Sequence, residues 1–172
     1  MSTTPLPPVV VMGVSGCGKS TVGSLMGEQL NMSFHDGDDL HPAANKAKMA
    51  AGIPLDDDDR KPWLEEIGRT FRTQAEHGAP AIIACSALKR SYRDLLRSHV
   101  PDVVFVHLNG DRSTLLERMA ARDHEFMPIS LLDSQLNALE PLGQDENHLL
   151  ADITLNPAAL VENISARLAA FG

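Results

Sequence analysis

Residues 13–20 read GVSGCGKS and match the phosphate-loop pattern GxxxxGK[ST]. The apolar run Val9–Met12 precedes them and a helical pattern begins at Lys19, which is the context that the pattern requires. Glycines let successive backbone N–H groups point inward, where they can donate to phosphate oxygens. The positive N-terminal end of the following helix also attracts phosphate, so such a loop binds polyphosphate. The alternative, a strand-to-helix turn with a chance lysine, leaves the full pattern unexplained. We therefore expect the phosphates of ATP at this loop.

Several side chains of the loop have predicted roles. Lys19 is expected to reach the β- and γ-phosphates, and Ser20 to bind Mg²⁺. Cys17 is interpreted as a small filler, and a reactive thiol with a pKa lowered by the helix dipole is the alternative. The residues expected to bind phosphate are Gly13, Val14, Ser15, Gly16, Cys17, Gly18, Lys19, Ser20 and Thr21, joined by Arg118 and Arg122 further along the chain.

Short β-branched runs alternate with longer amphipathic segments, which is typical of a parallel sheet with helices on both faces. The predicted strands are Val9–Met12, Ala81–Cys85, Val103–Leu108 and Ile153–Leu155, with a weaker one at Ser33–His35. The predicted helices are Lys19–Leu30, Pro42–Ala50, Asp59–Glu76, Lys89–Ser98, Ser113–Arg122, Ile129–Leu139 and Pro157–Ala170. Pro62 is tolerated in a first turn, so the third helix should start near it. The expected fold class is α/β, a three-layer P-loop NTPase fold with a mobile helical lid.

Length and charge restrict the function further. A chain of 172 residues fits one domain, taken as 1–172. The formal net charge of −8 argues against a nucleic-acid-binding or membrane-binding protein, because a negative field repels both. The first residues lack the pattern of a signal peptide, and no apolar run is long enough to span a membrane. Two cysteines offer no disulfide framework, so we expect a cytoplasmic protein.

Two carboxylates follow the weak second strand, at Asp36 and Asp38. Alternate strand residues point the same way, so both can face the phosphate loop, one near Mg²⁺ and the other accepting a proton from a substrate hydroxyl. The alternative is an Asp/Gly turn that caps the next helix. Asp39 is expected to be a plain cap.

Further candidates lie after the second and third strands. Arg60 carries a fork of donors suited to a carboxylate or phosphate, although it could instead pair with Asp56 or Asp57. Ser86 and Lys89 should emerge at a strand end, with a basic helix start as the alternative. The candidate substrate-binding residues are Asp38, His41, Arg60, Ser86 and Lys89. His41, His107 and His124 show no metal-ligand spacing, so structural roles are their default.

The region of about 118–142 is the expected lid. Arg118 and Arg122 lie four residues apart on one helical face, just before a polar loop, and can close over ATP. Ordinary surface charge is the alternative. The catalytic candidates are Lys19, Asp36, Asp38 and Arg122.

The chain resembles the small P-loop gluconokinases, which are related in plan to shikimate kinase and the nucleoside monophosphate kinases. The resemblance runs nearly end to end and is carried by GVSGCGKS at 13–20, DGDDLHP at 36–42, DDDRKPW at 57–63, CSALKRSYRDLLR at 85–97 and LLDSQLNALEP at 131–141. It implies transfer of the ATP γ-phosphate to gluconate, giving 6-phosphogluconate for the pentose phosphate route. It also implies that Asp36 lies near Mg²⁺ and Asp38 beside the substrate, and that the protein forms a homodimer.

Two rival functions stay open. Another metabolite kinase of this fold is the nearer one, but shikimate kinases carry a glycine triplet where this chain has Cys85-Ser86-Ala87. A non-catalytic ATP-binding module is the other, and the pair Asp36 and Asp38 argues against it. The chain also departs from the family in the lid, where His124 does not directly precede Phe126, so we assign His124 no catalytic role.

Overall fold

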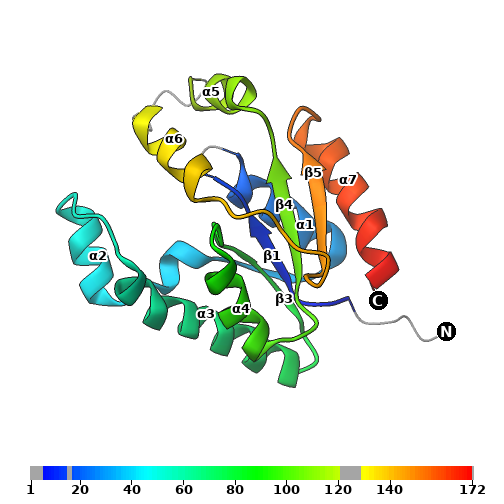
Figure 1. The fold of residues 1–172 in the computed structure, drawn as a ribbon. Helices are drawn as coiled ribbons and strands as arrows, with labels where there is room; N and C mark the ends of the chain where they lie inside the picture. Colours follow the sequence, from blue (N-terminus) through cyan, green and yellow to red (C-terminus); the bar gives the residue numbers. More distant parts are fainter. Residues whose placement is uncertain (1–5, 15–16, 121–128, 172) are drawn as a thin grey trace.

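The computed structural model describes residues 6–14, 17–120 and 129–171 (Figure 1). Its centre is a five-stranded sheet in the order β2-β3-β1-β4-β5, in which every neighbouring pair is parallel. The strands are β1 (Val9–Met12), β2 (Ser33–Asp36), β3 (Ala81–Ala84), β4 (Val104–Asn109) and β5 (His148–Asp152). The expected α/β fold class is therefore confirmed.

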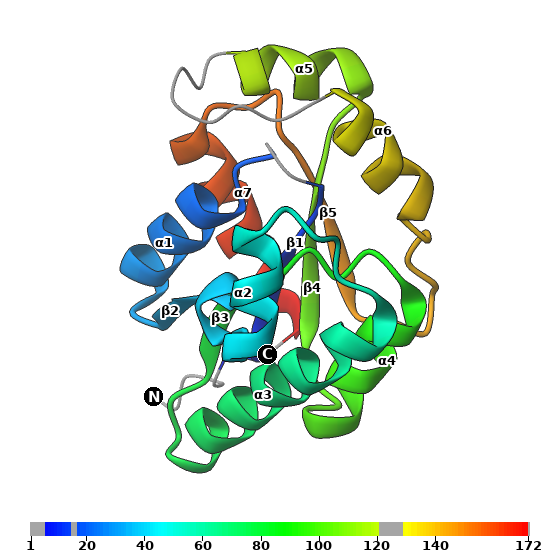
Figure 2. The same ribbon diagram turned by 90° about the vertical axis from the view of Figure 1, so that its left-hand side faces the viewer.

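Helices cover both faces of this sheet, as Figures 1 and 2 show. They are α1 (Lys19–Leu30), α2 (Ala43–Ala50), α3 (Asp57–Glu76), α4 (Arg90–His99), α5 (Arg112–Ala120), α6 (Ile129–Ala138) and α7 (Pro157–Leu168), with 3₁₀ turns at Gly37–Leu40 and Ala169–Phe171. None of the helices in the described part of the chain has the length and apolar character needed to cross a membrane.

The alternation of side chains along β1 divides the apolar interior into two cores. Val9 and Val11 pack with α1 and α7 on one face, while Val10 and Met12 pack with α3 and α4 on the other. All four valine and methionine side chains are fully buried. A strand buried on both faces reads as a continuous apolar run, which is why it was recognisable in the sequence.

The predicted last strand, Ile153–Leu155, is wrong: β5 ends at Asp152. Ile153 is buried and apolar, but the residues after Asp152 form a turn. The carboxylate of Asp152 accepts hydrogen bonds from the backbone N–H and the hydroxyl of Thr154, at 2.9 and 2.7 Å. This local contact ends the strand, and the true strand was missed because only its three central residues, 149–151, are apolar.

Pro62 does not lie in the first turn of α3, so that prediction is also wrong. The helix begins earlier because Asp56 and Asp59 form a capping box, with hydrogen bonds of 2.7 and 3.1 Å between each side chain and the other's backbone N–H. The proline leaves the carbonyl of Asp58 without its helical partner, and Asp58 is exposed to solvent, which can replace that bond.

Candidate active site

The phosphate loop joins β1 to α1 and requires glycine at two points. Gly13 and Gly18 have backbone φ angles of +147° and +95°, which residues with a side chain rarely adopt. A Cβ on Gly13 would also lie 3.0 Å from the carbonyl oxygen of Leu108, at the end of β4. The N–H of Gly13 donates to the carbonyl of Ser86 at 3.3 Å, which ties the loop to the end of β3. Ser15 and Gly16 lie outside the described residues.

The Lys19 side chain folds back along the phosphate loop. Its ammonium donates to the carbonyls of Gly13 and Val14, at 3.1 and 3.2 Å. The charge is therefore held beside the strand ends, where the phosphates of a nucleotide would enter.

The two residues predicted to bind Mg²⁺ are in contact. The hydroxyl of Ser20 donates to Asp36 Oδ2 at 3.0 Å, although the two residues belong to α1 and β2. Asp36 Oδ1 accepts the backbone N–H of Asp38, also at 3.0 Å, and so caps the 3₁₀ turn. Asp36 therefore has the capping role that we expected of Asp39. A hydroxyl and a carboxylate beside a phosphate loop fit Mg²⁺, which is bound by one or two carboxylates, substrate phosphates and water.

Asp38 lies in an environment that suits a proton acceptor. The residue is exposed, but partial desolvation of its carboxyl raises its pKa, the neighbouring charge of Asp36 raises it further, and the charge of Lys19 opposes both. Burial raises the pKa of the nearby Cys85 thiol to about 12, and the charges of Lys19, Asp38 and Asp36 also act on it. Lys19, Asp36 and Asp38 therefore lie near the phosphate loop at the carboxyl ends of β1 and β2, and their catalytic roles stay predictions.

His41 is buried and stacks on the side chain of Trp63. Its ring stacks on Trp63 with centroids 4.2 Å apart, and its Nδ1 lies 3.2 Å from the Asn45 side-chain nitrogen. Burial lowers the pKa of His41, and the charges of Arg60 and Lys46 lower it further, so the ring is neutral near pH 7. Trp63 is in the core, as expected, and donates to the carbonyl of Gly37 at 2.7 Å.

Arg60 and Lys89 converge on Tyr92. Arg60 Nη1 donates to the Tyr92 hydroxyl at 3.1 Å, and Lys89 Nζ lies 5.5 Å from the centre of the ring. Lys89 also forms an ion pair with Asp57, at 2.9 Å. The fold thus brings the two predicted substrate cations together from α3 and the start of α4. In the described structure the Arg60 guanidinium donates to neither the Asp56 nor the Asp57 carboxylate, and only its backbone N–H donates to the carbonyl of Asp56, at 3.1 Å.

A buried arginine that sequence reasoning missed holds the loop after β3. Arg93 is fully buried and donates to the carbonyls of Ala87 and Leu88, at 2.9 and 3.1 Å, within the loop that carries Ser86 and Lys89. The loop is unusual because Ala87 has a φ of +48°. A signal was present, since Arg93 follows Tyr92 and precedes Leu96 by three residues on the apolar face of α4.

The lid prediction is tested only in part. Arg118 is described, and its guanidinium donates to the carbonyls of Ile153 and Leu155 after β5. Arg122 and His124 lie outside the described residues. A role for either arginine in binding phosphate stays a prediction.

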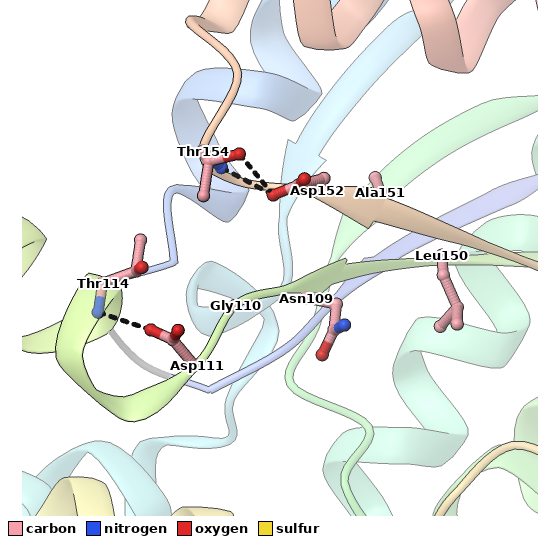
Figure 3. A pocket seen from close by; sticks show the side chains of 8 residues that line it. All are labelled: Asn109, Gly110, Asp111, Thr114, Leu150, Ala151, Asp152 and Thr154. Atoms are coloured by element: carbon pink, nitrogen blue, oxygen red, sulfur yellow. Dashed lines mark hydrogen bonds between the residues drawn. The ribbon is translucent and has the colours of Figure 1, made fainter.

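An open pocket of about 360 Å³ lies where β4 and β5 end (Figure 3). Its lining residues are Asn109, Gly110, Asp111, Thr114, Leu150, Ala151, Asp152 and Thr154. Asp111 starts α5 by accepting the backbone N–H of Thr114 at 2.8 Å. Because β4 pairs with β1, this pocket lies on the side of the phosphate loop opposite to β3 and Asp36.

Comparisons with known proteins agree with this geometry. The family described as shikimate kinase matches residues 15–167. The thermosensitive gluconokinase of Escherichia coli is 46% identical over 153 residues, which cover 84% of this chain and 82% of that one. A gluconokinase of Gluconobacter oxydans is 44% identical, over 91% and 88% of the two chains. The crystal structure of a gluconokinase from Sinorhizobium meliloti is 45% identical, with a TM-score of 0.87 over 96% and 93%. The chain therefore belongs to the gluconokinase family, within the wider group described by shikimate kinase.

Proposed function

We propose that this protein transfers the γ-phosphoryl group of ATP to a hydroxyl of gluconate, giving 6-phosphogluconate and ADP. The observation that carries the proposal is that Lys19, Asp36 and Asp38 lie together beside the phosphate loop, while the cations Arg60 and Lys89 meet at Tyr92. Gluconate is an anion with several hydroxyls, so it requires both a cationic contact and a proton acceptor. The gluconokinase relatives support this choice of acceptor.

Asp38 is the proposed proton acceptor. Its carboxylate takes the proton of the attacking hydroxyl, the new bond forms between that oxygen and the γ-phosphorus, and the bond to the oxygen bridging the β- and γ-phosphates breaks. Lys19 neutralises charge that develops on the phosphoryl oxygens, and Arg122 assists from the lid. Ser20 and Asp36 would hold Mg²⁺, which would neutralise phosphate charge when bound.

We assign the nucleoside of ATP to one side of the phosphate loop and gluconate to the other. The pocket at the ends of β4 and β5 takes the nucleoside of ATP, with Arg118 beside it, since it adjoins the loop away from Asp36. Gluconate lies against His41, Arg60, Ser86 and Lys89. We further propose that residues 1–172 form one domain, that about 118–142 act as a lid, and that the protein works in the cytoplasm as a homodimer.

ADP release from MgATP tests the proposal, with D-gluconate compared against shikimate, AMP, glucose and no acceptor. Turnover with gluconate alone is expected. The Lys19→Ala variant is the negative control, because it should lose phosphoryl transfer while it remains folded. Turnover with a different acceptor would refute the assignment of gluconate, and no acceptor-dependent turnover at all would favour a non-catalytic ATP-binding module.

A further inference from the structure

Asp57 makes contacts that the start of α3 does not require. The capping box of that helix is formed by Asp56 and Asp59, so Asp57 is free of that role. Its Oδ1 instead accepts hydrogen bonds from two groups at the start of α4, the ammonium of Lys89 at 2.9 Å and the hydroxyl of Tyr92. Asp58, the next acid along the helix, makes no such contact among the described residues. The position of Asp57 is therefore specific to the cation cluster.

The cluster has more positive charge than Asp57 neutralises. Arg60 donates to the Tyr92 hydroxyl at 3.1 Å and lies 5.8 Å from the ring centroid, while Lys89 lies 5.5 Å from it. Within the described parts of the chain, Arg60 forms no ion pair of its own. Two cations and one carboxylate therefore leave one net positive charge around the Tyr92 side chain.

The contact between Asp57 and Lys89 can also be exchanged. The side chains are 66% and 37% exposed, respectively. An ion pair in contact with solvent contributes little, because water and salt screen it. The hydrogen bonds from Tyr92 and Lys89 lower the pKa of Asp57, so it is an anion at neutral pH. A carboxylate is thus held loosely on a cation that is proposed to bind the carboxylate of a substrate.

We propose that Asp57 is an internal stand-in for the carboxylate of the acceptor: it occupies Lys89 and Tyr92 in the free enzyme, and gluconate displaces it on binding. This inference rests on the proposed function. In the free enzyme the stand-in keeps Lys89 beside Tyr92 and next to Arg60, so both cations are already gathered when the substrate arrives. Because Asp57 competes with the acceptor's carboxylate for Lys89, the protein binds an anionic acceptor more weakly than it would if Asp57 carried no charge.

The test compares Asp57→Asn with Asp58→Asn by calorimetric titration of D-gluconate. Both variants remove one negative charge at neighbouring exposed positions, so their effect on the overall field is matched. We expect Asp57→Asn to lower the dissociation constant about two- to fivefold, in line with the small contribution of an exposed pair. Asp58→Asn should leave it unchanged. The melting temperature of each variant checks that the fold is intact.

A double-mutant cycle locates the effect. In a Lys89→Gln background, Asp57→Asn should no longer tighten binding, because the cation for which the two carboxylates compete is absent. Equal affinity in the two single variants, or weaker binding in Asp57→Asn, would overturn the stand-in, and the latter would instead indicate that Asp57 contacts a substrate hydroxyl. If wild-type protein phosphorylates gluconate, either result leaves the proposed function intact; a wild-type protein that does not bind gluconate would overturn both.

Discussion

The Nε atom of Arg93 lies 2.6 Å from Oε2 of Glu146, and both side chains are fully buried. The same guanidinium donates to the carbonyls of Glu140 and Pro141, at 2.9 and 3.3 Å. Together with its bonds to the loop after β3, Arg93 joins that loop to the segment that leads from α6 to β5. A buried charge is tolerated only when its donors are satisfied, and here the backbone carbonyls satisfy them.

Removing the charge of Glu146 should therefore destabilise the protein strongly. In Glu146→Gln the buried guanidinium loses its counter-charge, and we expect a loss of about 3–5 kcal/mol in the free energy of unfolding. Glu66→Gln is the matched control, because its pair with Arg69 is about half exposed and should contribute less than about 1 kcal/mol. Urea unfolding measures both, and similar midpoints for the two variants would contradict the prediction.

Asp38→Asn should separate binding from chemistry. The amide keeps the size of the side chain but cannot take the hydroxyl proton, so kcat should fall about a hundredfold to ten-thousandfold. Binding of ATP should be unchanged, because the phosphate loop is intact. Asp39→Asn removes the same charge from the next residue and should retain turnover. Steady-state kinetics with both variants decides, and an unchanged kcat in Asp38→Asn would remove Asp38 from the mechanism.

His107 should make stability depend on pH. Burial lowers its pKa from 6.5 to about 4, and the charges of Arg93 and His148 act in the same direction. The unfolded chain takes up the proton first, so this contribution is complete above the unfolded pKa and is lost as the pH falls toward about 4. Between about pH 7.5 and about pH 5 the loss should be about 2 kcal/mol. Urea midpoints across this range should fall less steeply in His107→Gln, and equal slopes would contradict this assignment.

Neither thiol should react readily in the folded protein. Cys17 is 1% exposed and Cys85 is 3% exposed, and burial raises the pKa of Cys85 to about 12. The interpretation of Cys17 as a filler is thus favoured over a reactive thiol. Mass spectrometry after iodoacetamide treatment should show no modification of the native protein and two modified cysteines in urea. Rapid modification of native Cys17 would restore the alternative.

The parts of the fold that were predictable depend on local sequence. The bounds of β1 and α1 are as predicted, because a continuous apolar run and a phosphate-loop pattern mark them. The spacing also placed Ser20 and Asp36 at neighbouring strand ends, whereas the assignment of Asp36 rather than Asp38 to Mg²⁺ came from the family resemblance. Pro62 shows the limit of such rules, because the capping box outweighs its preference for a first turn.

The missed residues depend on contacts between distant segments. Arg93 and Glu146 are 53 positions apart, and Tyr92 meets Asp57 across 35 positions. A charged residue within an amphipathic helix is usually at the surface, so the position of Arg93 on the apolar face of α4 was only a weak signal, and the packing of α4 against the segment after α6 encloses it. Periodicity cannot specify which distant carboxylate or carbonyl accompanies such a group.

The order of elements along the chain has a consequence for the exchange of parts between relatives. The residues proposed to contact gluconate all lie between β2 and the start of α4, whereas the pocket at β4 and β5 comes later. A chimaera that receives this one continuous segment from another kinase of the group would acquire a new acceptor site and keep its own nucleotide site. Arg93 lies just inside α4 and Glu146 lies before β5, so both stay with the recipient when the segment ends at the start of α4. A longer segment from a donor without arginine at position 93 would remove the buried cation that Glu146 contacts. Compatible crossovers would therefore be those that take Arg93 and Glu146 from the same parent.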